Sequence, residues 1–277
     1  MIDKVKLVVC DIDSTLVTTV KRELTPKTKE VIDRLHAHGV YFGIASGRSV
    51  DQQLSKEARE WGFDYEFDVL IGMNGSELWD GINFKRYDYY KLKKEWIKEI
   101  IELMEPFNLD PFLYYKGKML CLRLDDSTMR SSRKNRTDVI VAKDVSQMYA
   151  EDNAKIMFRT TEAQMPAIEE YVNQHPSPYY KAFKTQTTML EFADKRVNKA
   201  LALKHFCDIN QIPAEQVMAF GDMNNDNEMI QYSGWGVCMI NGSDETKAIS
   251  KDITTKSNDE DGFAIYMEDN YLNKMGW

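Results

Sequence analysis

Two carboxylates close to the start of the chain flank a single apolar residue. They are Asp11 and Asp13, and the polar pair Ser14 and Thr15 follows them. Adjacent carboxylates repel each other unless a cation lies between them. Mg²⁺ is the natural partner, because it takes oxygen ligands and keeps positions open for water and a substrate phosphate. Such an ion also lets a carboxylate attack a phosphate dianion. Taken alone, Asp-x-Asp is more typical of a turn or a helix cap, so the rest of the chain must decide.

A second acidic loop occurs about two hundred residues later. The apolar run Val217–Phe220 leads through a glycine into Asp222, and Asn225 and Asp226 follow. If both apolar runs are strands of one parallel sheet, Asp222 comes to lie beside the first pair of carboxylates and completes a metal site of Asp11, Asp13 and Asp222. Asn225 and Asp226 are predicted to support that site. By itself, this loop is also compatible with an ordinary glycine-aspartate turn.

The first half of the chain predicts the elements that would position these loops. Lys4–Asp13 is nearly all apolar until its carboxylates, which is typical of a parallel strand buried on both faces. Thr25 and Pro26 form an N-cap and a first-turn proline, and Gly39 is placed to end that helix. Val40–Ala45 then predicts a second strand.

The alternation of strand and helix continues and later returns. Ser49 and Gln52 form a capping-box pattern, and Gly62 can end the helix that they begin. Four more elements are predicted towards the end of the chain: a helix from Asn198, the strand Val217–Phe220, a helix from about Asn227 and the strand Gly236–Ile240. This pattern predicts an α/β fold with a Rossmann-like parallel sheet, whose ligands bind at the carboxyl ends of the strands.

Residues 84–190 have a different pattern. Phe112–Tyr115 and Met119–Leu124 flank a lysine-glycine-lysine turn and predict a hairpin, and Ile156–Arg159 predicts a further strand. The basic segment Arg130–Arg136 is interpreted as a solvated loop. We therefore predict one core, 1–83 with 191–277, that is interrupted by an inserted α+β domain.

Composition narrows the class of protein. The chain has 277 residues, of which 43% are hydrophobic, and a formal net charge of -8. That charge disfavours nucleic acid as a partner. The apolar run Val5–Cys10 is too short for a membrane span or a signal core, so we expect a cytoplasmic protein, as a monomer or a weak homodimer. The four cysteines are widely spaced and are interpreted as reduced, mostly buried thiols.

Four motifs together resemble those of the haloacid dehalogenase superfamily, and specifically of its Cof-like sugar phosphatase branch. They follow the family's order and span nearly the whole core: Asp11-Ile12-Asp13-Ser14-Thr15, Ser46-Gly47-Arg48, Lys199 at a helix start, and Gly221-Asp222 through Asn225-Asp226. Three further segments also look like this branch: Met73-Asn74-Gly75-Ser76, Asn241-Gly242 and Ser257-Asn258-Asp259-Glu260-Asp261-Gly262. One position departs from the family, because Ser14 stands where most members have glycine. If φ is positive there, the serine is strained.

The resemblance implies roles for these residues. Asp11 would be the nucleophile that forms an aspartyl-phosphate, and Asp13 would be the general acid and base, with its backbone carbonyl on the Mg²⁺ ion. The substrate phosphate would be bound by Ile12, Ser46, Gly47, Lys199 and Asn225. Of these, Ser46 and Lys199 would also be catalytic. Supporting roles would fall to Thr15, Arg48 and Asp226. Arg48 could equally reach the substrate or a structural carboxylate.

The inserted domain would be the cap that selects the substrate, a small phosphomonoester such as a sugar phosphate or a phosphorylated cofactor. Tyr114, Lys116, Arg123, Lys181 and Lys184 are candidate contacts, and the sequence does not choose among them. Two other functions share the motifs. A phosphomutase would return the phosphoryl group to another hydroxyl of the sugar, and a silent binding module would keep only the fold. The intact charged residues argue against the silent module, since buried charges are costly to keep without a use.

Overall fold

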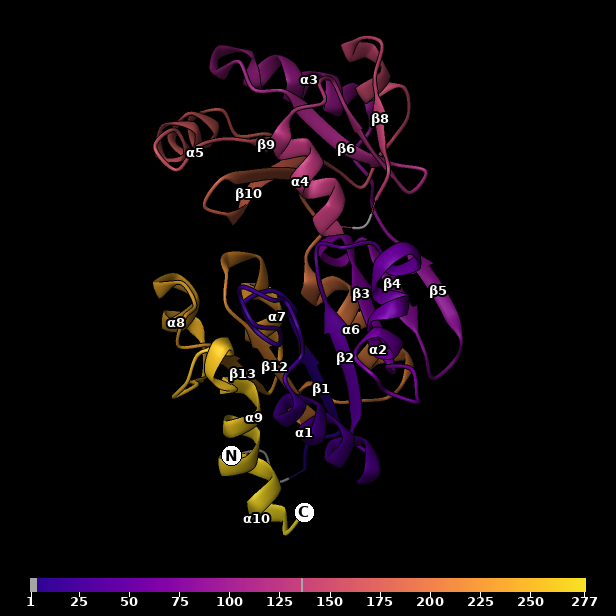
Figure 1. Cartoon of the computed structure of the whole chain (residues 1–277), viewed down its shortest axis with the longest axis vertical. Helices are drawn as coiled ribbons and strands as arrows, with labels where there is room; N and C mark the ends of the chain where they lie inside the picture. The colour runs from indigo at the N-terminus through magenta and orange to yellow at the C-terminus, as the bar shows by residue number, and fades with distance from the viewer. Residues whose placement is uncertain (1–3, 136) are drawn as a thin grey trace. The chain divides into compact units, whose positions relative to one another are not determined.

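The computed structural model describes residues 4–135 and 137–277, and the chain divides into two compact units. Unit 1 contains the chain up to Tyr89 together with Asn198–Trp277, and unit 2 is Tyr90–Val197 (Figure 1). Both junctions between the units lie several residues later in the chain than the predicted boundaries, which were 83/84 and 190/191. The reason is strand pairing. β5 (Lys85–Asp88) pairs with β4 (Glu77–Asp80) in unit 1, while β11 (Met189–Asp194) pairs with β9 (Lys155–Arg159) and β10 (Tyr180–Gln186) in unit 2.

The eight-stranded sheet of unit 1 has the order β14-β13-β12-β1-β2-β3-β4-β5. Its remaining strands are β1 Leu7–Cys10, β2 Tyr41–Ala45, β3 Val69–Gly72, β12 Val217–Gly221, β13 Trp235–Cys238 and β14 Asp252–Ile253. All neighbours from β14 to β3 run parallel, and β4 and β5 extend the sheet as an antiparallel hairpin. The predicted parallel core is thus confirmed, with a hairpin at one edge that the sequence did not indicate.

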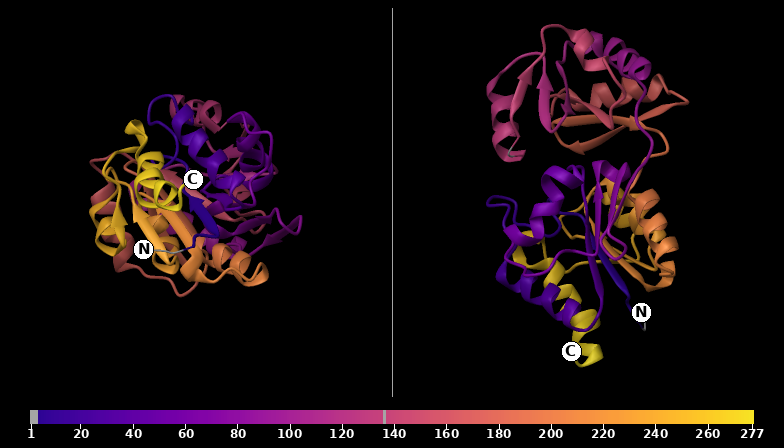
Figure 2. Two further views of the ribbon diagram at one scale, coloured as in Figure 1. Left: turned by 90° about the horizontal axis from the view of Figure 1, so that it is seen from below. Right: turned by 90° about the vertical axis from the view of Figure 1, so that its right-hand side faces the viewer.

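Helices cover both faces of this sheet (Figure 2, right). They are α1 Pro26–Ala37, α2 Ser55–Glu60, α6 Lys199–Ile209, α7 Asn227–Tyr232, α8 Asp244–Ile249, α9 Gly262–Met267 and α10 Asn273–Met275, with short turns η1 Val50–Leu54, η2 Met73–Gly75, η5 Ala214–Gln216, η6 Asn224–Asp226, η7 Asn258–Glu260 and η8 Glu268–Leu272. Alternate residues of β1 pack on opposite faces of the sheet. Val8 and Cys10 pack with α1 and α9, and Leu7 and Val9 pack with α6 and α7.

Helix caps explain where several elements begin and end. The Thr25 hydroxyl accepts from the N–H of Thr28, and Gly39 adopts a positive φ of 73° just past α1, as predicted. The prediction of a capping box at Ser49 was wrong. Ser49 occupies the N-cap position, but its hydroxyl accepts no capping bond among the described residues, and its N–H donates to Gln53 Oε1 at 3.2 Å.

Unit 2 contains a six-stranded sheet in the order β10-β11-β9-β6-β7-β8. Its elements are β6 Pro111–Tyr115, β7 Lys118–Cys121, β8 Val139–Val141, β9 Lys155–Arg159, β10 Tyr180–Gln186, α3 Lys94–Met104, α4 Asp126–Asn135, α5 Met165–Gln174, η3 Glu105–Phe107 and η4 Val145–Tyr149. The predicted hairpin is confirmed as β6 and β7, which turn through positive φ at Lys116 and Gly117. Helices α3 and α5 pack on one face of the sheet through Ile97, Ile100 and Ile168.

The predicted loop at Arg130–Arg136 was wrong over its described part. Arg130–Asn135 belong to α4, and Arg136 lies outside the described residues. A sequence signal for this helix existed, because Asp125 Oδ1 accepts from the N–H of Thr128 at 2.6 Å and caps its start. All four cysteines are buried free thiols, as expected. None of the helices in the described ranges has the length and apolarity needed to cross a membrane.

Candidate active site

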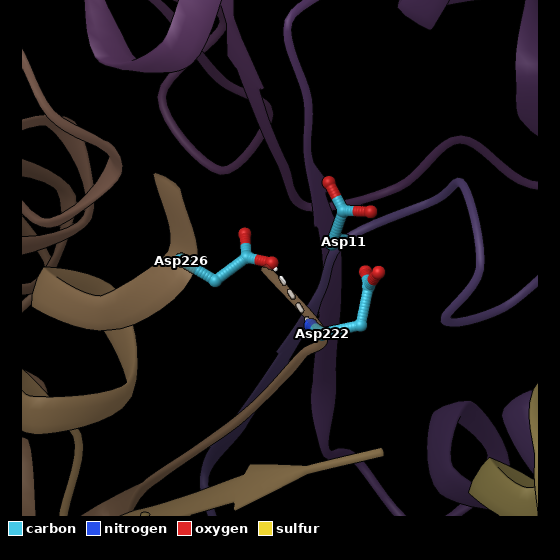
Figure 3. A group of neighbouring side chains, drawn as sticks. All are labelled: Asp11, Asp222 and Asp226. Atoms are coloured by element: carbon cyan, nitrogen blue, oxygen red, sulfur yellow. Dashed lines mark hydrogen bonds between the residues drawn. The ribbon is translucent and has the colours of Figure 1, made fainter. Parts of the chain in front are cut away.

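Strand register brings the two acidic loops together. In the parallel pair β1–β12, Cys10 lies opposite Phe220, and the N–H of Asp11 donates to the Phe220 carbonyl at 2.9 Å. The next residues of both strands therefore leave the same edge of the sheet side by side. As Figure 3 shows, Asp11 and Asp222 project there together, and Asp226 approaches from the turn before α7.

Three buried carboxylates form the centre of the site. Asp11, Asp222 and Asp226 each offer an oxygen within 4.8 Å of the others. The Asp226 carboxylate accepts from the N–H of Asp222 at 3.0 Å, and Thr15 donates its hydroxyl to Asp222 at 3.0 Å. Asp226 and Thr15 thus hold the Asp222 loop from two sides.

Lys199 enters this cluster from the first turn of α6. Its Nζ lies 2.5 Å from Asp11 Oδ1 and also pairs with Asp226, and its side chain is fully buried. The helix begins at this residue because the Asn198 side chain accepts from the N–H of Leu201 at 2.8 Å. Lys199 therefore lies in contact with both acidic loops.

The balance of buried charge shows what the cluster lacks. Burial raises the pKa of Asp11 to about 7, against the opposing effect of Lys199, and Asp226 and Asp13 raise it further. Burial also raises the pKa of Asp222 well above its usual range. Burial disfavours the charged form of Lys199, but Asp11 and Asp226 outweigh it and raise its pKa. One lysine among three buried carboxylates leaves excess negative charge, and an all-oxygen donor set of this kind fits a hard divalent cation.

Asp13 does not join the buried carboxylates with its side chain. Its carboxylate pairs with Arg22 and with Arg48, the latter at 3.0 Å, and 45% of its side-chain surface is exposed. Arg48 in turn pairs with Glu57. Of the two roles left open for Arg48, the structure thus shows the one in which it contacts carboxylates.

Ser46 and Asn225 lie at the same end of the sheet. Ser46 follows β2, where its N–H donates to the Ile71 carbonyl at 2.8 Å, and Gly47 continues the bend towards Arg48. Asn74, which follows β3, connects the two: its N–H donates to the Ser46 carbonyl, and its side chain accepts from Asn225 at 3.3 Å.

The loop after Asp11 is tightly turned. The carbonyl of the buried Ile12 accepts from the N–H of Leu16 at 3.0 Å. Ser14 has φ of 63°, so the condition under which serine is strained holds, at a cost of about 1 kcal/mol relative to glycine. Asn241 compensates in part, because its side chain donates to the Ser14 carbonyl at 2.8 Å.

Comparison with known proteins agrees with this geometry. Residues 8–267 match the family model of the haloacid dehalogenase-like hydrolases. The chain belongs to this family. It is also similar to the 5-amino-6-(5-phospho-D-ribitylamino)uracil phosphatase YitU of Bacillus subtilis, at 26% identity over 95% of this chain and 96% of that protein.

A further relative and a solved structure are similar to this chain, the solved structure in its fold. A phosphoglycolate phosphatase of Methanobrevibacter smithii is 27% identical over 91% of this chain and 92% of that protein. The crystal structure of a haloacid dehalogenase-like hydrolase from Bacteroides thetaiotaomicron superposes with a TM-score of 0.79 at 24% identity, covering 97% of this chain and all of that one. The protein is thus a haloacid dehalogenase-like hydrolase.

Three residues of this haloacid dehalogenase-like site were missed by sequence reasoning. Arg22 and Glu57 belong to the charge network around Asp13, and Asn74 connects Ser46 with Asn225. Asn74 carried a signal, since it lies in one of the segments typical of the branch. Arg22 and Glu57 lie in no motif, and only the folded loops bring them to the site.

Proposed function

We propose that the protein hydrolyses small phosphomonoesters in two steps through a phosphorylated Asp11. The observation that carries this proposal is the convergence on Asp11 of one buried lysine and two further buried carboxylates. Such a cluster is costly to bury, and a carboxylate held beside two cations, one of them Lys199, can approach a phosphate dianion.

Mg²⁺ is the cation that we propose for the site. The Asp226 carboxylate already accepts hydrogen bonds from Lys199 and from the N–H groups of Asp222 and Met223. We therefore propose that it holds these groups in place and is not itself a metal ligand. The ligands would then be the carboxylates of Asp11 and Asp222 and the backbone carbonyl of Asp13. When bound, Mg²⁺ would neutralise charge on the phosphoryl oxygens and on the attacking carboxylate.

The residues divide the chemistry between them. An Asp11 oxygen attacks phosphorus, the ester P–O bond breaks, and Asp13 gives its proton to the departing oxygen. Asp13 then takes a proton from water, whose oxygen attacks the phosphoryl group and releases inorganic phosphate and free Asp11. A positioned acid and base of this kind is worth roughly 10²–10⁴ in rate.

The remaining core residues would hold the phosphoryl oxygens. We propose that Ser46, Lys199 and Asn225 donate from their side chains, and Ile12 and Gly47 from their backbone amides. Fixed donors stabilise charge that develops during transfer, and this positioning is most of what a phosphoryl-transfer enzyme contributes. Thr15, Arg48 and Asp226 would keep the donors and carboxylates in place.

Substrate choice is proposed to lie with unit 2. Its position as an insert within the core, and its own hydrophobic core, support the role of a cap that selects the leaving group. The relatives act on a phosphorylated ribitylaminouracil and on phosphoglycolate. Sugar phosphates, phosphorylated cofactor precursors and phosphorylated small acids are therefore the classes to test first.

The test is phosphate release from a panel of these esters plus an aryl phosphate, with Mg²⁺ and with a chelator. Asp11→Asn should abolish release, whereas Asp64→Asn, an exposed carboxylate of the same unit, should leave it unchanged. Mg²⁺-independent release, or full activity of Asp11→Asn, would contradict the mechanism. Transfer from a bisphosphate without net phosphate release would instead identify a mutase.

A further inference from the structure

The Asp13 carboxylate lies at a partly exposed position and is held there by ion pairs. Nearly half of its side-chain surface is exposed, at 45%, and its Oδ1 atom forms ion pairs with the guanidinium groups of both Arg22 and Arg48. Arg48 is itself oriented by Glu57. Two cations from different loops therefore restrict the position of this oxygen more than a single ion pair would.

Arg22 comes from a compact loop that returns towards Asp13. Val17 and Leu24 form an antiparallel bridge across the base of this loop, and the N–H of Arg22 donates to the Thr18 carbonyl at 2.9 Å. Arg22 has φ of 58°, a backbone conformation that a non-glycine residue adopts only when its surroundings enforce it.

Residues near the other end of the chain hold the loop that carries Arg22. Asn258 is buried, and its side-chain amide donates to the Val17 carbonyl at 2.8 Å and to the Thr19 hydroxyl at 3.1 Å. The N–H of Thr19 donates to Asp259 at 2.7 Å. This gives a physical use to the segment around Asn258, which the proposed mechanism leaves unexplained.

We propose that Arg22 is a positioning residue that aims the Asp13 carboxylate at the leaving oxygen, and that Asn258 holds the loop that carries Arg22. This inference rests on the proposed role of Asp13 as the general acid. Because ion pairs with half-exposed carboxylates contribute little to stability, the arginine acts on orientation far more than on folding. A small misplacement of a reacting group can still cost a large factor in rate.

The leaving group distinguishes positioning from a structural role. An alkoxide, as in a sugar phosphate, departs only when it is protonated, whereas nitrophenolate is a stable anion that needs little help. Arg22→Gln should therefore lower kcat/KM for an alkyl phosphate by about 10- to 100-fold, but by less than about threefold for nitrophenyl phosphate. Arg22→Lys should recover part of the loss, because it restores a cation.

Lys21 provides the matched control, since it is an exposed lysine directly before Arg22 in the chain. Lys21→Gln should behave as the wild type with both esters. Asn258→Ala should show the same selective loss as Arg22→Gln, together with a lower melting temperature. Equal losses with the two esters, or an Arg22→Gln variant as active as Lys21→Gln, would overturn the positioning role alone. A wild type that releases no phosphate from either ester would overturn both this inference and the proposed function.

Discussion

A Cβ atom on Gly75 would lie 1.9 Å from the carbonyl oxygen of Asn198. The two residues belong to segments more than a hundred positions apart, η2 after β3 and the N-cap of α6. Lys199 follows Asn198 directly, so the close approach at Gly75 determines where the buried lysine enters the carboxylate cluster. Gly75 also has φ of 104°, which disfavours a side chain for a second reason.

Replacing Gly75 by alanine should destabilise the protein by about 2–4 kcal/mol, through backbone strain and displacement of the α6 start. Activity should fall with it, because Lys199 moves. Gly39→Ala is the matched control: its φ is also positive, but apart from its chain neighbours no atom of the described residues lies within 4 Å of the new Cβ, so only about 1 kcal/mol is expected. Denaturant unfolding measures both. Equal effects would show that the contact with Asn198 is unimportant.

Stability should depend on pH in a way that Mg²⁺ changes. Burial raises the pKa of Asp11 from 3.8 to about 7, with Lys199 opposing. The folded state then holds a proton that the unfolded state releases, so this group's stabilising effect is lost as pH rises from about 4 through about 7. Melting temperatures with a chelator should fall across this window, and stabilisation by Mg²⁺ should grow. Asp11→Asn should have a flatter profile; an unchanged profile would contradict the assignment.

Lys199 should be essential for folding as well as for turnover. Lys199→Met leaves buried carboxylates without their cation, which should cost about 3–5 kcal/mol. Saturating Mg²⁺ should recover part of the stability but not the activity. Lys204→Met, at an exposed position of the same helix, should change neither. Thermal melts and phosphate release are the two measurements, and a stable, active Lys199→Met would contradict the role of the lysine.

A second buried ion pair lies in unit 2, where Lys155 Nζ is 2.8 Å from Glu191 and both side chains are less than a tenth exposed. Glu191→Gln should destabilise unit 2 by about 3–5 kcal/mol. Glu169→Gln is the control, since its pair with Lys184 is about one-third exposed, and it should cost less than about 1 kcal/mol. Hydrogen exchange of the unit 2 amides distinguishes this loss from global unfolding, and equal protection in both variants would refute it.

The features that could be predicted from the sequence are those that depend on residues close together in the chain, such as apolar strands and helix caps. The apolar runs around Val8 and Ala219 became neighbouring parallel strands, and Asp222 consequently came to lie beside Asp11. The cap at Thr25 was predicted in the same way, because a short polar side chain at a helix start commonly accepts a hydrogen bond from the first turn, and the helix predicted from Asn198 begins there.

Other features depend on contacts between segments far apart in the chain, and the sequence pattern did not predict them. The edge hairpin β4–β5 is rich in charge and lacks the apolar alternation that marks a strand. Arg22 reaches Asp13 from a loop in which its own φ is positive, and Asn258 holds that loop from more than two hundred residues away. Neither contact follows from spacing along the chain.

The order of strands in the core has a consequence for synthesis. β1 lies between β2 and β12, and β12 begins only at Val217. At 5–20 residues per second, a ribosome needs roughly 10 to 40 seconds to add the intervening residues. During that time one edge of β1, which Asp11 follows, lacks its partner strand β12, while the residues of unit 2 are still being added. Nascent chains are therefore exposed to misassociation in this interval, and slow translation before Val217 would lengthen it.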